Sequence, residues 1–251
     1  MEERLNKWLS QMGVCSRREA DRLIEAGKVL VDNRPASMGQ KVTPGQKVVC
    51  NGKMVRVDRS QRPRPVLLAV NKPKGIVCTT TDKDRAENIV DFLGYPERIY
   101  PVGRLDKDSE GLLLMTNQGD LVNKIMRSGN AHEKEYIVTI DKPVTEHFLE
   151  QMAGGIRLPE LDQVTRPCKV KKVERNTFSI ILTQGLNRQI RRMCEVCGCQ
   201  VRRLVRVRIM NIRLGNLRTG AYRQITKEEY EELTGLLKDS SSLSLKERKN
   251  Q

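Results

Sequence analysis

Aromatic residues and histidines are scarce in this chain of 251 residues. It contains three Phe, five Tyr, one Trp and only two histidines, His132 and His147. So few histidines give little support to a mechanism that uses His as acid and base. No apolar run approaches the ~20 residues that a membrane helix needs, so we expect no membrane partner.

The chain also lacks the signatures of secretion and of bound cofactors. Residues 1–4 have no apolar core of a signal peptide, and seven cysteines, an odd number, are typical of reduced thiols. There is no P-loop and no dinucleotide fingerprint. Cys194, Cys197 and Cys199 do not form the two separated pairs that zinc usually needs. We therefore expect a cytoplasmic protein with no cofactor and no metal.

Positive charge is what the chain has in excess. The net charge is +15, from 46 basic and 31 acidic residues. Residues 1–64 hold 14 basic and 7 acidic side chains, and residues 169–213 hold 12 and 2. Two basic regions that flank a near-neutral middle predict a polyanionic partner that is held at two places.

Short elements at the start of the chain predict a small separate domain. Apolar residues at helical spacing predict a helix over residues 5–12, and the capping box Ser16–Glu19 begins a second helix. Residues 29–31 and 45–50 are predicted strands, the second followed by the hairpin signal Asn51-Gly52. Two short helices followed by a small sheet resemble the S4 RNA-binding domain.

Composition sets the expected domain limits. Residues 59–65 are polar, Pro-rich and without periodicity, which predicts a linker between an S4-like domain, 1–58, and a larger domain, 66–238. Residues 239–251 are rich in Ser and Lys and are predicted to form a disordered tail.

The most informative stretch runs from residue 103 to residue 117. Four consecutive apolar residues, 112–115, predict a short buried strand, and the loop before it is densely charged. Ionisable side chains at the mouth of a rigid core strand are typical of an active site. The spacing of acids approximates a calcium loop, but Asn117 stands where a bidentate Glu is required. Asp106 is therefore either a solvated turn residue or a catalytic carboxylate.

Three further segments carry candidate residues. Residues 66–70 predict a buried strand that runs into a turn containing Lys72 and Lys74, which can meet phosphate or be ordinary turn residues. Alternation over residues 133–140 puts Tyr136, Val138 and Ile140 on one face, which by itself predicts a half-buried core tyrosine. Residues 201–210 predict a strand with Arg206 and Arg208 on one face, which suits a nucleic-acid backbone.

A helix beginning near Asn187 is also predicted. Its apolar stripe runs from Ile190 to Cys197, and Arg188, Arg191 and Arg192 lie on the opposite face.

Three separated motifs resemble those of the RNA pseudouridine synthases. The run 103–113 resembles the active-site motif, Lys134-Glu135-Tyr136 resembles a Lys-x-Tyr motif, and residues 184–193 resemble a third motif. The match is to the branch that contains the small-subunit synthase A and the large-subunit synthases B, E and F. The resemblance implies an α+β fold. A small N-terminal S4-like RNA-binding domain would precede a synthase domain built on a mixed, mainly antiparallel sheet flanked by helices.

The resemblance also implies roles for individual residues. Asp106 would be the catalytic carboxylate, as nucleophile or as base toward a sugar proton. The ring of Tyr136 would stack on the target uracil, and Arg191 would hold the carboxylate charged and aimed. The residues expected to bind RNA are basic, namely Arg4, Lys7, Arg17, Arg18, Lys72, Lys74, Arg104, Lys134, Arg188, Arg192, Arg206 and Arg208.

The implied substrate is a uridine of large-subunit ribosomal RNA, and the resemblance allows a uridine in a tRNA anticodon arm as a second target. We expect the protein to act as a monomer. Two alternatives remain open. One is a non-catalytic S4-type RNA chaperone or ribosome assembly factor, and the other is a tRNA-type synthase that does not depend on its S4 domain.

Overall fold

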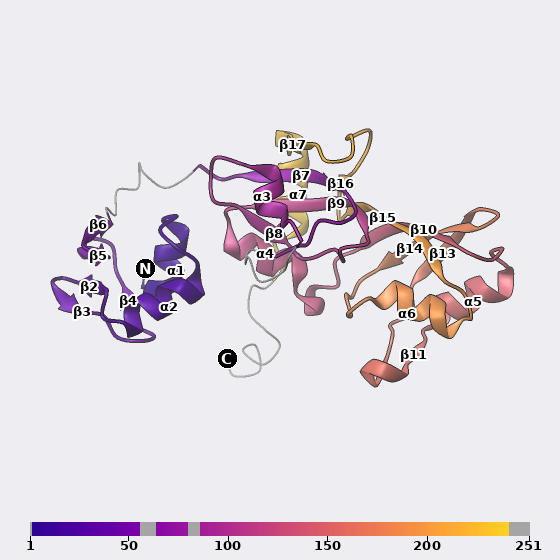
Figure 1. The fold of residues 1–251 in the computed structure, drawn as a ribbon, viewed down its shortest axis with the longest axis horizontal. Coiled ribbons are helices and arrows are strands. Elements are labelled where there is room, and N and C mark those ends of the chain that lie inside the picture. Colours follow the sequence, from indigo (N-terminus) through magenta and orange to yellow (C-terminus); the bar gives the residue numbers. More distant parts are fainter. Residues whose placement is uncertain (1, 56–63, 80–85, 241–251) are drawn as a thin grey trace. The chain divides into compact units, whose positions relative to one another are not determined.

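The computed structural model describes residues 2–55, 64–79 and 86–240, which belong to two compact units (Figure 1). One unit comprises residues 1–65 with 96–98, and the other comprises 66–95 with 99–251. Most of the expected linker, 59–65, and of the expected tail, 239–251, lies outside the described residues.

The first unit combines two helices with two small sheets. Ser16 caps the second helix by accepting a hydrogen bond from the Glu19 N–H at 3.1 Å, as the capping box predicted. Apolar residues of both helices and of three strands contribute to its core. The sheets have the orders β3-β2-β5-β6 and β1-β4. The elements are β1 (Glu3–Arg4), α1 (Leu5–Gln11), α2 (Arg17–Glu25), β2 (Val29–Val31), β3 (Arg34–Pro35), β4 (Lys41–Val42), β5 (Val48–Cys50) and β6 (Lys53–Val55).

The second unit alternates strands and helices along a longer chain. Its helices are α3 (Ile89–Leu93), α4 (Gly119–Met126), α5 (Glu146–Gly154), α6 (Gln189–Val196) and α7 (Lys227–Leu236), with 3-10 turns at Ser128–Asn130 and Pro159–Leu161. Its strands are β7 (Leu67–Lys72), β8 (Tyr100–Val102), β9 (Glu110–Thr116), β10 (Lys134–Ile140), β11 (Arg157–Leu158), β12 (Gln163–Val164), β13 (Lys169–Glu174), β14 (Thr177–Leu182), β15 (Val201–Ile209), β16 (Ile212–Arg213) and β17 (Tyr222–Gln224).

One large sheet organises the second unit. Its order is β13-β14-β10-β15-β9-β7-β17, with β16 attached to β15 and β8 to β9. The β15–β9 pair is parallel, and the other pairs are antiparallel. The expectation of a mixed, mainly antiparallel sheet flanked by helices is therefore confirmed.

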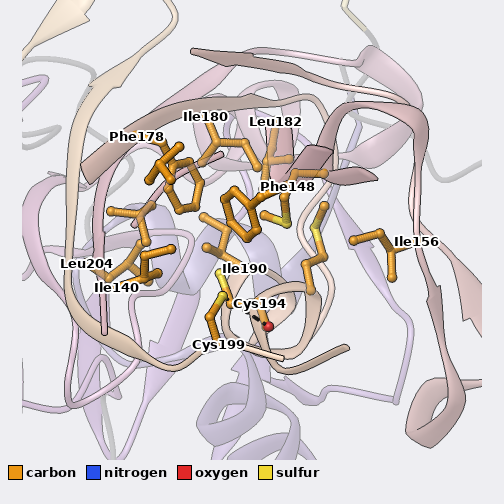
Figure 2. Packing of buried hydrophobic residues seen from close by; sticks show 14 of the residues in the cluster. Ile140, Phe148, Ile156, Phe178, Ile180, Leu182, Ile190, Cys194, Cys199 and Leu204 are labelled. Atoms are coloured by element: carbon orange, nitrogen blue, oxygen red, sulfur yellow. Dashed lines mark hydrogen bonds between the residues drawn. The ribbon is translucent and has the colours of Figure 1, made fainter. Parts of the chain in front are cut away.

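Helices cover the sheet and close its apolar cores. α5 and α6 pack with β10, β14 and β15, whereas α4 and α7 pack with β7 and β9 (Figure 1). In the first of these cores the Cys199 thiol donates a hydrogen bond of 3.3 Å to the Cys194 carbonyl (Figure 2). These cysteines are small core residues, and no group of three or more His, Cys, Asp or Glu in the described part of the chain can hold a metal ion. None of the helices described is long and apolar enough to cross a membrane.

The parallel pair β15–β9 requires a close approach at one glycine. Gly111 has φ of +99°, and it lies opposite Arg206 in the register of the two strands. A Cβ added there would overlap the Arg206 carbonyl oxygen and lie 2.8 Å from the Arg206 nitrogen. The glycine therefore allows β9 to continue beside β15 without a steric clash.

We predict that Gly111→Ala lowers the free energy of unfolding of the second unit by about 2–4 kcal/mol, because backbone strain and a backbone clash add. Urea unfolding followed by circular dichroism measures this, since the single tryptophan, Trp8, lies in the other unit. Gly215→Ala is the control, because Gly215 also has positive φ, +55°, but has open space around its Cβ position. Equal losses in the two variants would contradict a role for close packing at Gly111.

Candidate active site

A cavity of about 660 Å³ opens in the second unit, where β9, β15 and β10 lie next to one another. Its walls are the loop 103–109 and the segment 182–191, and its floor includes side chains of β10 and β15. Asp106 is the only acidic side chain among the described residues that line it. The basic side chains that line it are Arg104, Lys107, Lys134, Arg188, Arg191 and Arg206.

The loop that carries Asp106 is held through its carbonyl oxygens. Lys72 Nζ lies 3.4 Å from the Lys107 oxygen, which also accepts the Gly75 N–H at 2.9 Å. Arg191 Nη2 donates to the Asp108 oxygen at 3.1 Å, and Arg206 Nη1 donates to the Arg104 oxygen at 3.5 Å. Cationic donors thus fix the loop backbone and leave its carboxylates unused.

Lys72 has a structural position, which corrects the expectation that it binds RNA. β7 runs on through this residue in the buried interior, and its side chain is fully buried. The ammonium also donates to the Pro73 oxygen at 2.8 Å. Burial lowers the pKa of Lys72, and among the nearby charges that oppose this shift are those of Asp106 and Asp108. A phosphate at the surface cannot reach this group.

Arg191 contacts the Asp106 loop but not the Asp106 carboxylate. Its Nη2 is 3.1 Å from the Asp108 oxygen and 3.5 Å from Ser109 Oγ. Within the described ranges the Asp106 carboxylate has no hydrogen bond or ion pair, so the expected Arg191–Asp106 pair is absent. The buried Nε of Arg191 also has no partner there. Both residues line the cavity and keep hydrogen-bonding capacity that no described group uses.

A β-bulge separates Arg206 from Arg208. In the β10–β15 register, Tyr136 lies opposite Arg206 and Glu135 lies opposite Arg208, so Val207 is the extra residue. Arg206 consequently lines the cavity and is 1% exposed, with Nε bonded to the Leu112 oxygen at 2.7 Å. The prediction that Arg206 and Arg208 lie on the same face of the strand is wrong, because the bulge interrupts the regular alternation of side chains between them.

Arg208 is also not available to RNA. It donates to Glu135 at 2.8 Å, to Glu133 at 2.9 Å and to the Met210 oxygen at 2.8 Å. These carboxylates raise the pKa of Arg208 against the opposing effect of burial. Arg208 therefore stabilises the sheet and does not bind a ligand.

Lys134 and Tyr136 lie on the cavity side of β10. Lys134 is buried and donates to the His132 oxygen at 3.0 Å, and burial, with a smaller effect of Arg206, lowers its pKa to about 8. Tyr136 is half-buried and packs against the apolar clusters on both sides of the site. A surface phosphate contact for Lys134 is therefore excluded, whereas the ring of Tyr136 is placed at the cavity.

The other expected RNA-binding residues divide into two groups. Lys7 pairs with Glu3 at 3.3 Å, Lys74 pairs with Glu110 at 3.4 Å, and Arg192 pairs with Glu160. The remaining residues are exposed, and they are Arg4, Arg17, Arg18, Arg104 and Arg188.

Gln189 and Leu204 are among the lining residues that were not singled out from the sequence. Gln189 is buried and accepts the Leu186 N–H at 3.1 Å, which shapes the turn before α6. Leu204 supplies an apolar wall next to Arg206. The only sequence signal for Gln189 was its place inside the third motif, and Leu204 had the ordinary pattern of a core strand.

This arrangement suits a reaction on a planar ring of a substrate that binds in the cavity. A lone carboxylate faces an aromatic side chain and several guanidinium groups in one concave space. A carboxylate placed in this way can act as nucleophile or general base, and the cations can stabilise negative charge.

Comparison with known proteins identifies both parts of the chain. A family model described as RNA pseudouridylate synthase matches residues 66–196, and a model of the S4 domain matches residues 3–48. The chain is 52% identical to the dual-specificity RNA pseudouridine synthase RluF of Escherichia coli (strain K12), over 95% of this chain and 81% of that protein. It is 36% identical to the ribosomal large subunit pseudouridine synthase B of Bacillus subtilis (strain 168), over 93% of this chain and 96% of that protein.

A solved structure agrees with these matches. The crystal structure of a pseudouridylate synthase superposes with a TM-score of 0.67 at 27% identity, and it covers 92% of this chain and 99% of its own. The family model alone spans more than half of the chain, and it includes Asp106, Tyr136 and Arg191. The chain therefore belongs to the RNA pseudouridylate synthase family, as an RNA pseudouridine synthase with an N-terminal S4 domain.

Proposed function

We propose that this enzyme isomerises a uridine of large-subunit ribosomal RNA to pseudouridine in the cavity around Asp106. The observation that carries the proposal is the unpaired Asp106 carboxylate, the only acid among the described lining residues, in one cavity with Tyr136 and Arg191. The names of the two relatives support RNA, and for the relative from Bacillus subtilis ribosomal large-subunit RNA, as the substrate. The relative from Escherichia coli is named for dual specificity, which motivates a second target, and for this target we propose a uridine in a tRNA anticodon arm.

The reaction requires the uridine to leave its base stack. Flipping the nucleotide out costs a few kcal/mol. Stacking on Tyr136 would return ~1–3 kcal/mol, and phosphate contacts of exposed arginines would supply the rest. Asp106 would then act on the sugar, either as nucleophile at C1′ or as base toward the 2′ proton. Arg191 would hold the loop in register through Asp108 and Ser109.

The cellular setting is part of the proposal. All seven cysteines are unpaired, which agrees with a reducing cytoplasm. We also propose that the protein acts as a monomer. The competing function is an RNA chaperone or assembly factor without chemistry.

We predict that Asp106→Asn lowers product formation by more than about 10⁴-fold, because the amide is neither nucleophile nor base. RNA affinity should stay within about twofold, since phosphate contacts dominate it. The measurement is pseudouridine mapping on ribosomal RNA transcripts or immature subunits, with binding measured in parallel. Asp108→Asn is the matched control and should stay active, because Asp108 is exposed and uses its carbonyl, not its carboxylate, to bind Arg191. A wild-type protein that binds RNA but yields no product would favour the chaperone.

We predict that Arg191→Lys lowers kcat about 10²–10³-fold although the charge is kept, because a lysine cannot hold the loop and present a second donor together. Single-turnover kinetics at saturating enzyme measures the effect. Arg192→Lys is the control on the same helix, since Arg192 is bonded to Asn187 and Glu160 and lies outside the cavity lining. Comparable losses in both variants would assign the effect to α6 in general.

We predict that the double variant Arg17→Ala/Arg18→Ala reduces the slope of log Kd against log salt concentration by about 2, one for each lost phosphate contact. Both arginines are exposed at the start of α2. Binding titrations with the same RNA at several salt concentrations give the slope, and Lys227→Ala is a control for a lost surface charge. If the slope and the rate on ribosomal RNA do not change, a synthase that works independently of its S4 domain is supported instead.

A further inference from the structure

Two buried cations lie next to each other on the floor of the cavity. Lys134 on β10 is 5% exposed and Arg206 on β15 is 1% exposed. They are close enough for Arg206 to influence the ammonium of Lys134 electrostatically. Lys134 precedes Tyr136 by two residues on β10, and Arg206 is opposite Tyr136 in the register, so all three share one face.

Among the residues that the structure describes, no acid forms an ion pair with Lys134 or Arg206. Glu133 and Glu135, which flank Lys134, are both bonded to Arg208. Asp106 is the only acid among the described lining residues, and it forms no ion pair with any of them. Buried charge without a partner is strongly unfavourable, so a site of this kind is completed by an anionic ligand.

Both cations have donors left over. Arg206 Nη2 is buried and has no hydrogen-bond partner in the described structure. Lys134 Nζ bonds only to the His132 oxygen, at 3.0 Å, and an ammonium has three N–H groups. Both residues line the cavity, and each has N–H groups that no described group of the protein accepts.

We infer that Lys134 and Arg206 form an oxyanion subsite that stabilises the detached uracil as an anion between cleavage and reattachment. This inference rests on the proposed function and adds to it two residues that act on the base, whereas Asp106 acts on the sugar.

The chemistry requires such a charge whichever role Asp106 takes. The C1′–N1 bond breaks and its electron pair stays on the uracil, where the negative charge spreads over N1, O2 and O4. The sugar is left either as an ester of Asp106 or, after loss of the 2′ proton to Asp106, as an enol ether. C5 then bonds to C1′, either displacing the Asp106 carboxylate from the ester or, on the enol ether, as C2′ takes its proton back from Asp106. C5 loses its proton, N1 gains one, and Asp106 is regenerated as the carboxylate. The product is an isomer and no co-reactant is needed.

Two cations suit an anion that must turn. The uracil rotates to exchange N1 for C5, so a single directed hydrogen bond would be lost on the way. A guanidinium and an ammonium attract a delocalised charge in any of its orientations, and they do so more strongly in a buried site than in water.

The subsite predicts a pH dependence with a definite sign. Lys134 is the titrating group, with its pKa lowered to about 8 by burial and by Arg206. The other charged or titratable groups that line the cavity are Asp106, Arg104 and Lys107 from one loop, Arg188 and Arg191 from the other, and Cys78, Tyr136 and Arg206. His132 adjoins Lys134 through its backbone oxygen, and its pKa is lowered, chiefly by burial and also by the charge of Lys134. Because Lys134 is cationic below its pKa, the rate of the chemical step should fall as pH rises through about 8.

Single-turnover kinetics of the full-length protein on large-subunit ribosomal RNA transcripts tests the inference. Lys134→Met should lower the rate about 10²–10³-fold, while the Kd for RNA changes less than about threefold. Lys134→Arg should keep much of the rate and lose the alkaline decline, because an arginine stays charged. Lys227→Met, an exposed position far along the chain, removes the same charge and should leave the rate unchanged.

Replacing uridine with a nucleoside that has a better leaving group distinguishes a chemical role of Lys134 from a structural one. Fluorine at C5 stabilises the uracil anion without help from the protein. In RNA with 5-fluorouridine at the target, loss of the fluorinated nucleoside should be at least about tenfold less sensitive to Lys134→Met than conversion of uridine is. A merely misfolded or misaligned site would slow both RNAs equally.

Three results would overturn the inference. They are equal penalties for uridine and 5-fluorouridine, an alkaline decline that persists in Lys134→Arg, or a loss confined to RNA affinity. If the wild-type protein forms no pseudouridine in ribosomal RNA, the proposed function fails first and the inference falls with it. If the wild-type protein and Lys134→Met are equally active, only the inference fails.

Discussion

The proposed active site depends on a loop that is held by its backbone carbonyl oxygens rather than by its side chains. Lys72, Arg191 and Arg206 each bond to a different carbonyl oxygen of the loop around Asp106. Because these bonds use the carbonyls, the loop is fixed while the Asp106 carboxylate stays unpaired. A direct ion pair would have stabilised the carboxylate in its resting state and would have had to break, at least partly, before the acid could act on a substrate.

The large sheet brings these donors together from distant parts of the chain. β15 lies between β10 and β9, so one strand carries Arg206 past both Tyr136 and the Asp106 loop. The parallel pairing with β9 is possible because Gly111 has no side chain. The bulge at Val207 then points Arg206 toward the cavity and Arg208 toward Glu135. Two local irregularities of the backbone thus determine which cations enter the site.

The basic residues of this protein have three separate uses. Exposed arginines, such as Arg17 and Arg18, are suited to RNA phosphates. Arg208 and Arg223 are bonded to glutamates and stabilise the fold. Buried cations without acidic partners, Lys134 and Arg206, lie in the cavity. The net charge of +15 reports only on their sum, and burial and pairing decide what each charge can do.

The sequence by itself determined the elements, the family and the carboxylate at the centre. Apolar periodicity located α6, β9 and β10 within a few residues, and Ser16 caps α2 as the capping box predicted. Local signals are sufficient to locate helices and strands, because the spacing at which side chains return to the same face is a property of a short segment. Only the tertiary structure decided the roles of the cations. Lys72, Arg206 and Arg208 look alike in a sequence, and their different uses follow from sheet order, a one-residue bulge and the acids on neighbouring strands. These contacts join residues 35 to 102 positions apart, and no local pattern records which residues meet at such separations.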